Sequence, residues 1–181
     1  MSTKTLISVE EFAQMPQDEG IDYELVEGEL VPMSSGTPRH AIVRDDLIVL
    51  LKLFLRRHTL GIVLSKVDCR TLERSVRRPD VAFYTADRWR QIDPEKIPLS
   101  GTPDIAVEIL SPSESAINVH RKTAEYLKSG SQEVWLLDIS NQEIYIHTST
   151  SVRLLRSGDL LQSEVLPGFS VPVSDVLSPA I

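Results

Sequence analysis

The sequence predicts an α/β fold of the α+β type, in which helices flank a central mixed β-sheet. Residues 39–58 carry apolar side chains at helical spacing, and a helix with so wide an apolar stripe needs a sheet to pack against. Residues 104–110 and 133–138 are apolar runs of strand type, with a helical pattern at 116–129 between them. A strand–helix–strand unit of this kind pairs its two strands in parallel. Hairpin patterns elsewhere make the predicted sheet mixed.

The N-terminal part of the chain predicts two short elements before the long helix. Residues 8–15 begin with a serine cap and carry acids in the first turn, which indicates a short helix that ends at Pro16. Residues 23–33 predict a hairpin that turns at Glu27-Gly28. The long helix follows after a loop.

The middle of the chain predicts further strands and a loop. Residues 61–66 are a strand pattern, and residues 69–74 are a candidate partner for that strand. Another strand covers 81–83. Residues 84–101 are polar and contain prolines, which indicates a loop with one helical turn near 86–90.

The last part of the chain predicts the centre of the sheet and its closing strands. Residues 104–110 are the most apolar strand pattern and should be central. Either Ser113 or Ser115 can cap the helix that follows, and Gly130 ends it. Short closing strands and a C-terminal turn come last, at 143–148, 152–156, 160–165 and 168–173. No repeat or second-domain boundary is visible, so residues 1–181 are expected to form a single domain.

The composition is that of a globular protein without a membrane segment. The chain has 181 residues, of which 41% are hydrophobic and 25% charged. Its apolar runs are too short to span a bilayer, and the N-terminus does not resemble a secretion signal. The single cysteine, Cys69, excludes an internal disulfide and is typical of a reducing compartment. We therefore expect a cytoplasmic protein, with no membrane partner, in which Cys69 is structural.

Charge is unevenly distributed along the chain. The net charge of −7 argues against a general affinity for nucleic acid. Residues 52–90, however, contain ten Lys/Arg against four Asp/Glu. This stretch could bring a polyanion towards Asp80. From charge alone, a solvated surface is the favoured interpretation.

Two carboxylates within strand patterns are the strongest chemical signal. Asp80 directly precedes the strand at 81–83, and Glu108 lies inside the strand at 104–110. A carboxylate in a buried strand is costly unless a positive or hydrogen-bonding group meets it. Two such carboxylates on neighbouring strands, with a lysine nearby, indicate a divalent metal site with a cationic helper.

Lys122 is the lysine expected at this site. Val119, Lys122 and Tyr126 share one face of the predicted helix because they are spaced i, i+3 and i+7. Lys128 lies on a different face of the predicted helix. An ammonium on an apolar stripe needs an anion, and Glu108 on the preceding strand supplies one. The alternative is a surface lysine whose stem packs on the helix.

Glu24 and His40 are polar side chains with two interpretations each. Glu24 stands at the start of the predicted hairpin, where a solvent-facing strand residue is slightly favoured on the residues alone. His40 stands at the N-terminus of the long helix, where it could orient a site residue or serve only as a capping or surface group.

Several segments together resemble one known family. They are Arg78-Pro79-Asp80-Val81, the run from Glu108 to Ser113, Lys122, Tyr126 and the strand pattern at 133–138, together with the hairpin at 23–30 and His40. They are similar to a large, mostly uncharacterised bacterial family of restriction endonuclease-like proteins with the PD-(D/E)xK nuclease fold. The resemblance covers nearly the whole chain.

The resemblance implies that Asp80 and Glu108 are metal ligands and that Lys122 is the lysine of the signature. In the usual pattern the lysine stands two residues after the acid, a position that is Leu110 here, so the lysine has moved to the following helix. Asn118 also departs from the family, in which an aspartate often stands four residues before the lysine. The amide keeps a hydrogen-bonding group and removes a charge.

The implied function is a metal-dependent endonuclease that hydrolyses DNA phosphodiester bonds. Mg²⁺ (or Mn²⁺) would be held by Asp80, Glu108 and a carbonyl near Ile109, with waters completing six oxygens. Glu24 and His40 are further candidate catalytic residues that could hold a water or a second metal. DNA is the expected substrate, and a homodimer is expected because cutting a duplex usually needs two sites.

Two alternatives remain at this point. One is a weak or inactive nuclease-fold module that binds nucleic acid or protein as a dimer. The other is a structural ion pair of Lys122 with Glu108, without metal. The presence of both carboxylates and the lysine favours the enzyme. Burying two like charges is unfavourable, and an inactive site would have no function that requires it.

Overall fold

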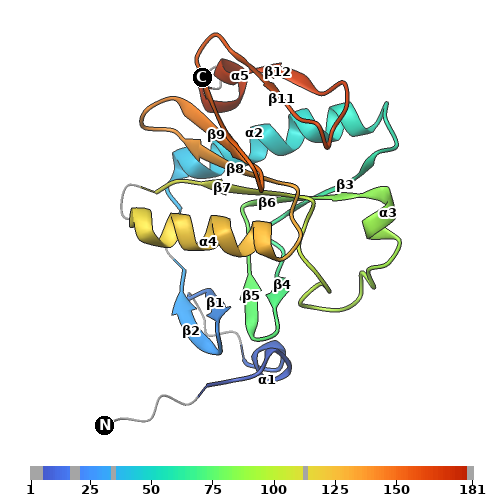
Figure 1. The fold of residues 1–181 in the computed structure, drawn as a ribbon, viewed down its shortest axis with the longest axis vertical. Helices are drawn as coiled ribbons and strands as arrows, with labels where there is room; N and C mark the ends of the chain where they lie inside the picture. Colours follow the sequence, from blue (N-terminus) through green and yellow to red (C-terminus); the bar gives the residue numbers. More distant parts are fainter. Residues whose placement is uncertain (1–5, 17–20, 34–35, 112–113, 179–181) are drawn as a thin grey trace.

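The computed structural model describes residues 6–16, 21–33, 36–111 and 114–178. Its centre is a six-stranded mixed sheet in the order β10-β9-β8-β7-β6-β3. These strands are β3 (Gly61–Ser65), β6 (Val81–Thr85), β7 (Ile105–Ile109), β8 (Glu133–Asp138), β9 (Glu143–His147) and β10 (Val152–Arg156). Figure 1 shows helix α2 on one face of this sheet and helix α4 on the other. The predicted fold class, a central mixed sheet flanked by helices, is therefore confirmed.

Strands β7 and β8 form the parallel pair of the sheet, and α4 (Ala116–Lys128) connects them. Ser115 caps α4, because its hydroxyl accepts a hydrogen bond from the backbone N–H of Asn118. The other candidate cap, Ser113, lies outside the described residues. The predicted crossover and the central position of β7 are both confirmed.

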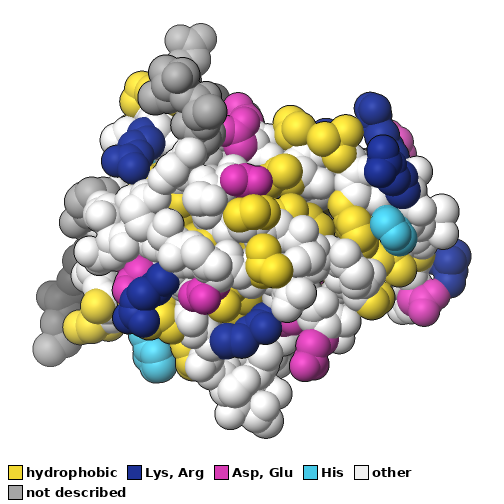
Figure 2. Space-filling view, turned by 90° about the horizontal axis from the view of Figure 1, so that it is seen from above, with side chains coloured by type: hydrophobic (Ala, Val, Ile, Leu, Met, Phe, Trp, Pro, Cys, Tyr) yellow, Lys and Arg dark blue, Asp and Glu magenta, His cyan; other side chains and the backbone are white. Residues whose placement is uncertain are grey.

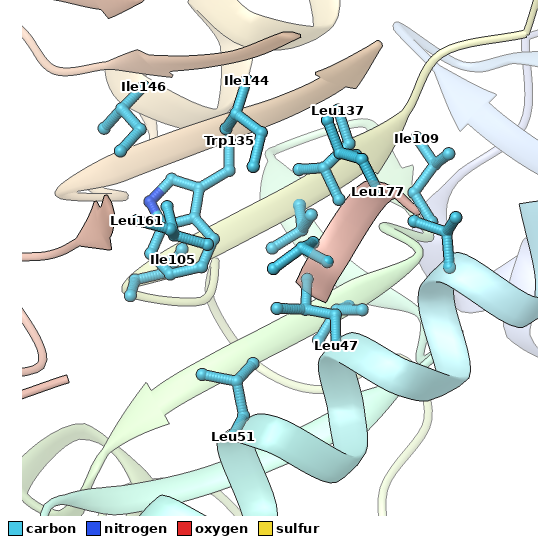
Figure 3. Close-up of a cluster of buried hydrophobic side chains, with 14 of the residues drawn as sticks. Leu47, Leu51, Ile105, Ile109, Trp135, Leu137, Ile144, Ile146, Leu161 and Leu177 are labelled. Carbon is cyan, nitrogen blue, oxygen red and sulfur yellow. The ribbon is translucent and has the colours of Figure 1, made fainter. Parts of the chain in front are cut away.

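Helix α2 (Pro38–Leu55) supplies much of the core on its side of the sheet. Thr37 caps it and Pro38 stands in its first turn, where a missing N–H costs nothing. Leu47 and Leu51 pack against side chains of β7 and β8, and Trp135 lies among them (Figure 3). Full burial of such a leucine stabilises the fold by about 1.5–3 kcal/mol. Helix α5 (Val173–Leu177) closes the same layer, as the picture shows for Leu177.

A second, four-stranded sheet lies beside the central one, in the order β2-β1-β5-β4. Its strands are β1 (Tyr23–Val26), β2 (Glu29–Pro32), β4 (Cys69–Leu72) and β5 (Ser75–Arg77). The hairpin β1–β2 turns at Glu27 and Gly28, which both adopt positive φ, as predicted. Helix α1 (Val9–Ala13) begins with a capping box at Ser8 and packs on this sheet through Val9.

The predicted pairing of residues 69–74 with 61–66 is wrong. Strand β3 pairs with β6 instead, and β4 pairs with β5 through a tight turn. Lys66 adopts φ 47° directly after β3, which turns the chain out of the central sheet. The β4–β5 connection is short, so closing it costs less conformational entropy than a longer connection would.

Two further elements differ from the predicted ranges. Strand β6 extends to Thr85, two residues into the predicted loop, and α3 (Ala86–Trp89) forms the predicted helical turn. At the C-terminus, β11 (Leu160–Gln162) does not join the central sheet but pairs with β12 (Ser170–Pro172). Within the described part of the chain, no helix is long and apolar enough to cross a membrane.

Candidate active site

The register of β6 and β7 brings Asp80 and Glu108 together. The two strands are antiparallel, and Val81 stands opposite Val107. Asp80 and Glu108 come one residue further along each strand, so they face each other across the pair. Because side chains alternate along a strand, both carboxylates point away from the core that contains Val81 and Val107. They therefore point to the side of the sheet that α4 covers.

Asp80 is held in place by two donors. Its Oδ2 accepts a hydrogen bond from the backbone N–H of Ile109 at 2.9 Å, and His40 Nε2 lies 3.1 Å from the same oxygen. Gly36 passes so close to the His40 ring that a Cβ there would lie 2.8 Å from Nδ1. The predicted site residue His40 thus contacts Asp80 directly, and the predicted ligand Ile109 lies beside it.

Glu108 is buried and accepts from α4 on both oxygens. Tyr126 donates its hydroxyl to Oε1 at 2.8 Å, and Lys122 Nζ lies 3.4 Å from Oε2. Burial raises the pKa of Glu108 to about 7; Lys122 opposes this, whereas the charges of Asp80 and Glu24 add to it. The carboxyl group therefore binds a proton more readily than an exposed glutamate does.

The ammonium of Lys122 points at the carboxylates, as the spacing along α4 predicts. Nζ lies 3.5 Å from Glu24 Oε2 and 3.9 Å from Glu114 Oε1, in addition to its contact with Glu108. Burial alone would lower the pKa of Lys122, but the surrounding carboxylates more than offset this and raise it. The side chain is therefore a fixed cation in the pocket.

Glu24 reaches the same site from the smaller sheet. Its side chain is buried, so the solvent-facing interpretation is wrong. Oε1 accepts the backbone N–H of Arg78 at 3.0 Å, and Arg77 donates to Oε2 at 3.0 Å. The smaller sheet is thereby tied to α4 through Glu24 and Lys122.

Sequence reasoning missed Arg77 and Glu125, which support Glu24. The guanidinium of Arg77 is only 2% exposed and lies between Glu24 and Glu125. Its Nε donates to Glu125 Oε2 at 3.0 Å, and Thr71 donates to the other oxygen of Glu125. The available signal was the position of Glu125, three residues after Lys122 and so on the same face of α4.

All five predicted side chains line one pocket of about 260 Å³: Glu24, His40, Asp80, Glu108 and Lys122. Ile109 and Asn118 line it as well. Its wall carries five Lys/Arg and four Asp/Glu side chains, so cations and anions are nearly balanced. Such a pocket can hold a cation on its carboxylates and a phosphate on its basic groups.

Several arginines of the basic stretch at 52–90 are paired with acids, some of which lie within the stretch and some elsewhere in the chain. Arg78 pairs with Asp68 at 2.6 Å and with Asp22, and Arg88 pairs with Asp104 at 3.0 Å. The face seen from above the sheet has hydrophobic side chains at its centre and charged groups mainly around them (Figure 2). Three basic residues of the stretch, Lys66, Arg77 and Arg78, line the pocket itself.

Cys69 is buried and its thiol donates to the backbone carbonyl of Arg77 at 3.2 Å. Burial raises the pKa of this thiol well above its usual value, so it is not a reactive thiolate. The structural role predicted for Cys69 agrees with this position.

The chemistry of the pocket's donors fits Mg²⁺ or Mn²⁺. Among the residues that the structure describes, no group of three or more His, Cys, Asp or Glu side chains could hold a metal ion. Asp80 and Glu108 are a pair of hard oxygen donors, and Mg²⁺ in proteins is commonly bound by one or two carboxylates together with waters and substrate phosphates. Asp80 and Glu108 therefore have the donor chemistry of such a shared site.

Comparison with known proteins identifies the family of the chain. The sequence model of the Uma2 family, described as "Putative restriction endonuclease", matches residues 9–174. The chain belongs to the Uma2 family. The resemblance seen in the sequence is therefore confirmed, and the match spans every residue of the Uma2 chain discussed above as a candidate ligand or catalytic group.

A solved structure shares the fold of this Uma2 protein. It is the crystal structure of a "putative nuclease belonging to DUF820" from Anabaena variabilis ATCC 29413, with a TM-score of 0.80 and 20% sequence identity. The alignment covers 95% of the Uma2 chain and 98% of the other chain. At this identity the likeness shows the fold alone. The comparison with curated proteins found no match.

Proposed function

We propose that the chain is a divalent-metal-dependent endonuclease that hydrolyses DNA phosphodiester bonds. The observation that carries this proposal is the position of Lys122 Nζ, 3.4 Å from Glu108 Oε2 in the pocket that also contains Asp80. Two carboxylates and one lysine in one pocket can supply the metal ligands and the cation of metal-assisted phosphodiester hydrolysis. The family description and the nuclease fold support the same reaction class.

The chain's own residues would divide the work as follows. Asp80 and Glu108, with the carbonyl of Ile109, would hold Mg²⁺ or Mn²⁺, which supplies a water of lowered pKa and compensates phosphate charge. Lys122 would orient the attacking water or stabilise the charge that develops on the phosphate. His40 would keep Asp80 in place through its 3.1 Å contact. Glu24 would do the same for Lys122.

DNA is the proposed substrate, and basic side chains of the pocket would receive its phosphates. Arg121 is exposed and lines the pocket next to Lys122, and Lys66 lines it from the end of β3. Both are long cations that can contact phosphate oxygens while the scissile bond lies near the carboxylates. With a net charge of −7, binding would depend on these local groups rather than on the charge of the whole chain.

Plasmid cleavage in Mg²⁺ or Mn²⁺ tests the proposal. Wild type should nick or linearise the plasmid, whereas Asp80→Ala and Lys122→Ala should each lose at least a hundredfold in rate. Lys128→Ala is the matched control, because Lys128 is exposed at the other end of α4 and should retain activity. Equal inactivity of wild type and all variants, with each protein folded by circular dichroism, would contradict the proposal.

Calorimetric titration with Mn²⁺ separates the enzyme from a nuclease fold that has no metal site. In that rival case the ion pair of Lys122 with Glu108 is only structural, and no saturable heat is expected. The enzyme predicts saturable binding in wild type that is lost in Asp80→Ala.

The same proposal includes a single domain over residues 1–181, a cytoplasmic location and a homodimer. The two strands of a duplex run in opposite directions, so a symmetric dimer would present one site to each strand. Sedimentation equilibrium at micromolar concentration measures the dimer directly, and a monomer both with and without DNA would contradict it.

A further inference from the structure

Helix α4 separates the active-site pocket from a second hollow. On one side, Asn118, Arg121 and Lys122 line the active-site pocket. On the other side, four α4 side chains spaced i, i+3, i+4 and i+7 line a hollow of about 520 Å³: Ala116, Val119, His120 and Thr123. The opposite wall comes from the neighbouring strands β8 and β9. None of the described residues that line this hollow has a role in the proposed reaction.

The surface that lines the hollow is mainly apolar and includes two imidazole side chains. Leu110, Val119 and Leu136 form its apolar part, and His120 and His147 add two imidazoles. Its one aspartate, Asp138, accepts two hydrogen bonds from Asn141, one from the backbone N–H at 3.0 Å and one from the side-chain Nδ2 at 2.9 Å. The carboxylate is therefore already engaged in a turn. None of the described residues that line it is Lys or Arg. The hollow therefore suits an uncharged, flat group better than a phosphate.

The two pockets meet at the N-terminal end of α4. Ser111 and Glu114 line both of them. The active-site pocket has five Lys/Arg side chains, and the hollow has none among its described residues. This division of charge matches the division within a nucleotide, whose phosphate is anionic and whose base is neutral and aromatic.

We propose that this hollow is a subsite for one unpaired nucleobase next to the scissile phosphate. His120 or His147 would stack on the base, and the leucines would cover its face. A base within a duplex is already stacked and paired, so it can enter the subsite only from a single strand or where the duplex is locally opened, as at a flipped base. The inference rests on the proposed function for the position of the phosphate, but binding of a base in the hollow can be measured without any cleavage.

Imidazole NMR signals test the subsite directly. The chain has four histidines, so each Hε1 signal can be resolved and assigned. Titration with thymidine or deoxyadenosine, which carry no phosphate, should shift the signals of His120 and His147 in a saturable way. His58 stacks on Phe54 at the end of α2 and does not line the hollow, so it is the internal control. Its signal should not shift. Shifts absent from both His120 and His147, or equal to that of His58, would overturn the subsite.

A cleavage assay places the subsite next to the reaction. A single-stranded oligonucleotide is compared with copies that each carry one abasic position, moved stepwise along the strand. Loss of the base beside the cut should slow wild type by about tenfold, within the range for one stacked base. His120→Ala combined with His147→Ala should abolish this difference, and His58→Ala should keep it.

The outcomes distinguish the subsite from the proposed function. Shifts at His120 and His147 without cleavage of any oligonucleotide support the subsite and contradict the nuclease. Cleavage that ignores every abasic position, with no histidine shift, supports the nuclease and overturns the subsite.

Discussion

Burial of Glu108 makes its protonation depend on pH within the neutral range. Its pKa is raised from 4.5 to about 7, first by burial and then by the nearby carboxylates. Between these two values the folded chain holds a proton that the unfolded chain has released. The contribution of this group to folding stability is therefore present at low pH and is lost as pH rises through about 7.

Glu108→Gln should stabilise the metal-free protein at pH 8. The amide imitates the protonated carboxyl, so the expected gain is up to about 3 kcal/mol at pH 8 and close to zero at pH 4.5. Urea unfolding in EDTA measures it at both pH values. The control Glu95→Gln changes an exposed carboxylate and should have no effect at either pH. A gain that is the same at both pH values would contradict the raised pKa.

Arg77 is expected to be a positioning residue with a large effect on stability. Arg77→Met leaves Glu24 and Glu125 buried without their common cation, which should cost about 3–5 kcal/mol. Lys122 still contacts Glu24 in this variant, so Glu125 is the acid that loses its cation. Adding Glu125→Gln removes that charge and should restore part of the loss, which urea unfolding of both variants measures. Arg90→Met is the control, because Arg90 is 70% exposed and its loss should be nearly neutral. No recovery in the double variant would contradict this network.

The sequence made Asp80, Glu108 and Lys122 predictable because each breaks a local pattern. A carboxylate in an apolar strand and a lysine on an apolar helix face both require a partner. Arg77 gave no such signal, since it stands among other basic residues and its partners are 48 and 53 positions away. The burial of Glu24 was also hidden, because an alternating hairpin does not reveal which of its faces will meet a helix such as α4.

Helix α4 lines two pockets, because its polar side chains lie on two different faces of the helix. Its moderate length and its serine cap are visible in the sequence, and so is the stripe that carries Lys122 and Tyr126. The face of His120 could not be assigned in advance. Its surroundings depend on which side chains of β8 and β9 lie opposite the helix in the folded sheet.

Arg121→Ala should weaken DNA binding without changing metal binding. If Arg121 contacts one phosphate, the slope of log affinity against log salt concentration should fall by about one. Fluorescence anisotropy with a labelled single strand over a salt series measures this slope, and Mn²⁺ calorimetry checks the metal site. Lys128→Ala on the same helix should leave the slope unchanged. An unchanged slope for Arg121→Ala would exclude that contact.

Strand partners were the least predictable feature of the sheets. The pattern at 69–74 was rightly a strand, but its partner depended on the turn at Lys66 and on the tight β4–β5 connection. Neither of these turns produces a periodic pattern of apolar residues from which the strand partner could be predicted. The parallel β7–β8 pair was predictable, because the helix between two buried strands permits little else.

The site exists only in the complete fold, because its side chains come from both sheets and two helices. Glu24 lies on β1, His40 on α2, Asp80 and Glu108 at β6 and β7, and Lys122 on α4. A cation that binds here binds the folded chain and not the unfolded one. Metal binding should therefore stabilise the whole molecule.

Mn²⁺ at ten times its dissociation constant should stabilise wild type by about 1.4 kcal/mol. Thermal unfolding at pH 7.5, with Mn²⁺ or with EDTA, measures the shift in midpoint. Asp80→Ala should lose the shift, whereas Asp87→Ala should keep it, since Asp87 is 85% exposed. Equal shifts in both variants would indicate that the ion binds elsewhere.

The anomalous difference map of a crystal soaked in Mn²⁺ tests the central claim most directly. The predicted result is one strong peak between the carboxylates of Asp80 and Glu108, with Lys122 still beside them. A map with no peak at these carboxylates in a crystal whose pocket is open to solvent would contradict the metal-dependent nuclease.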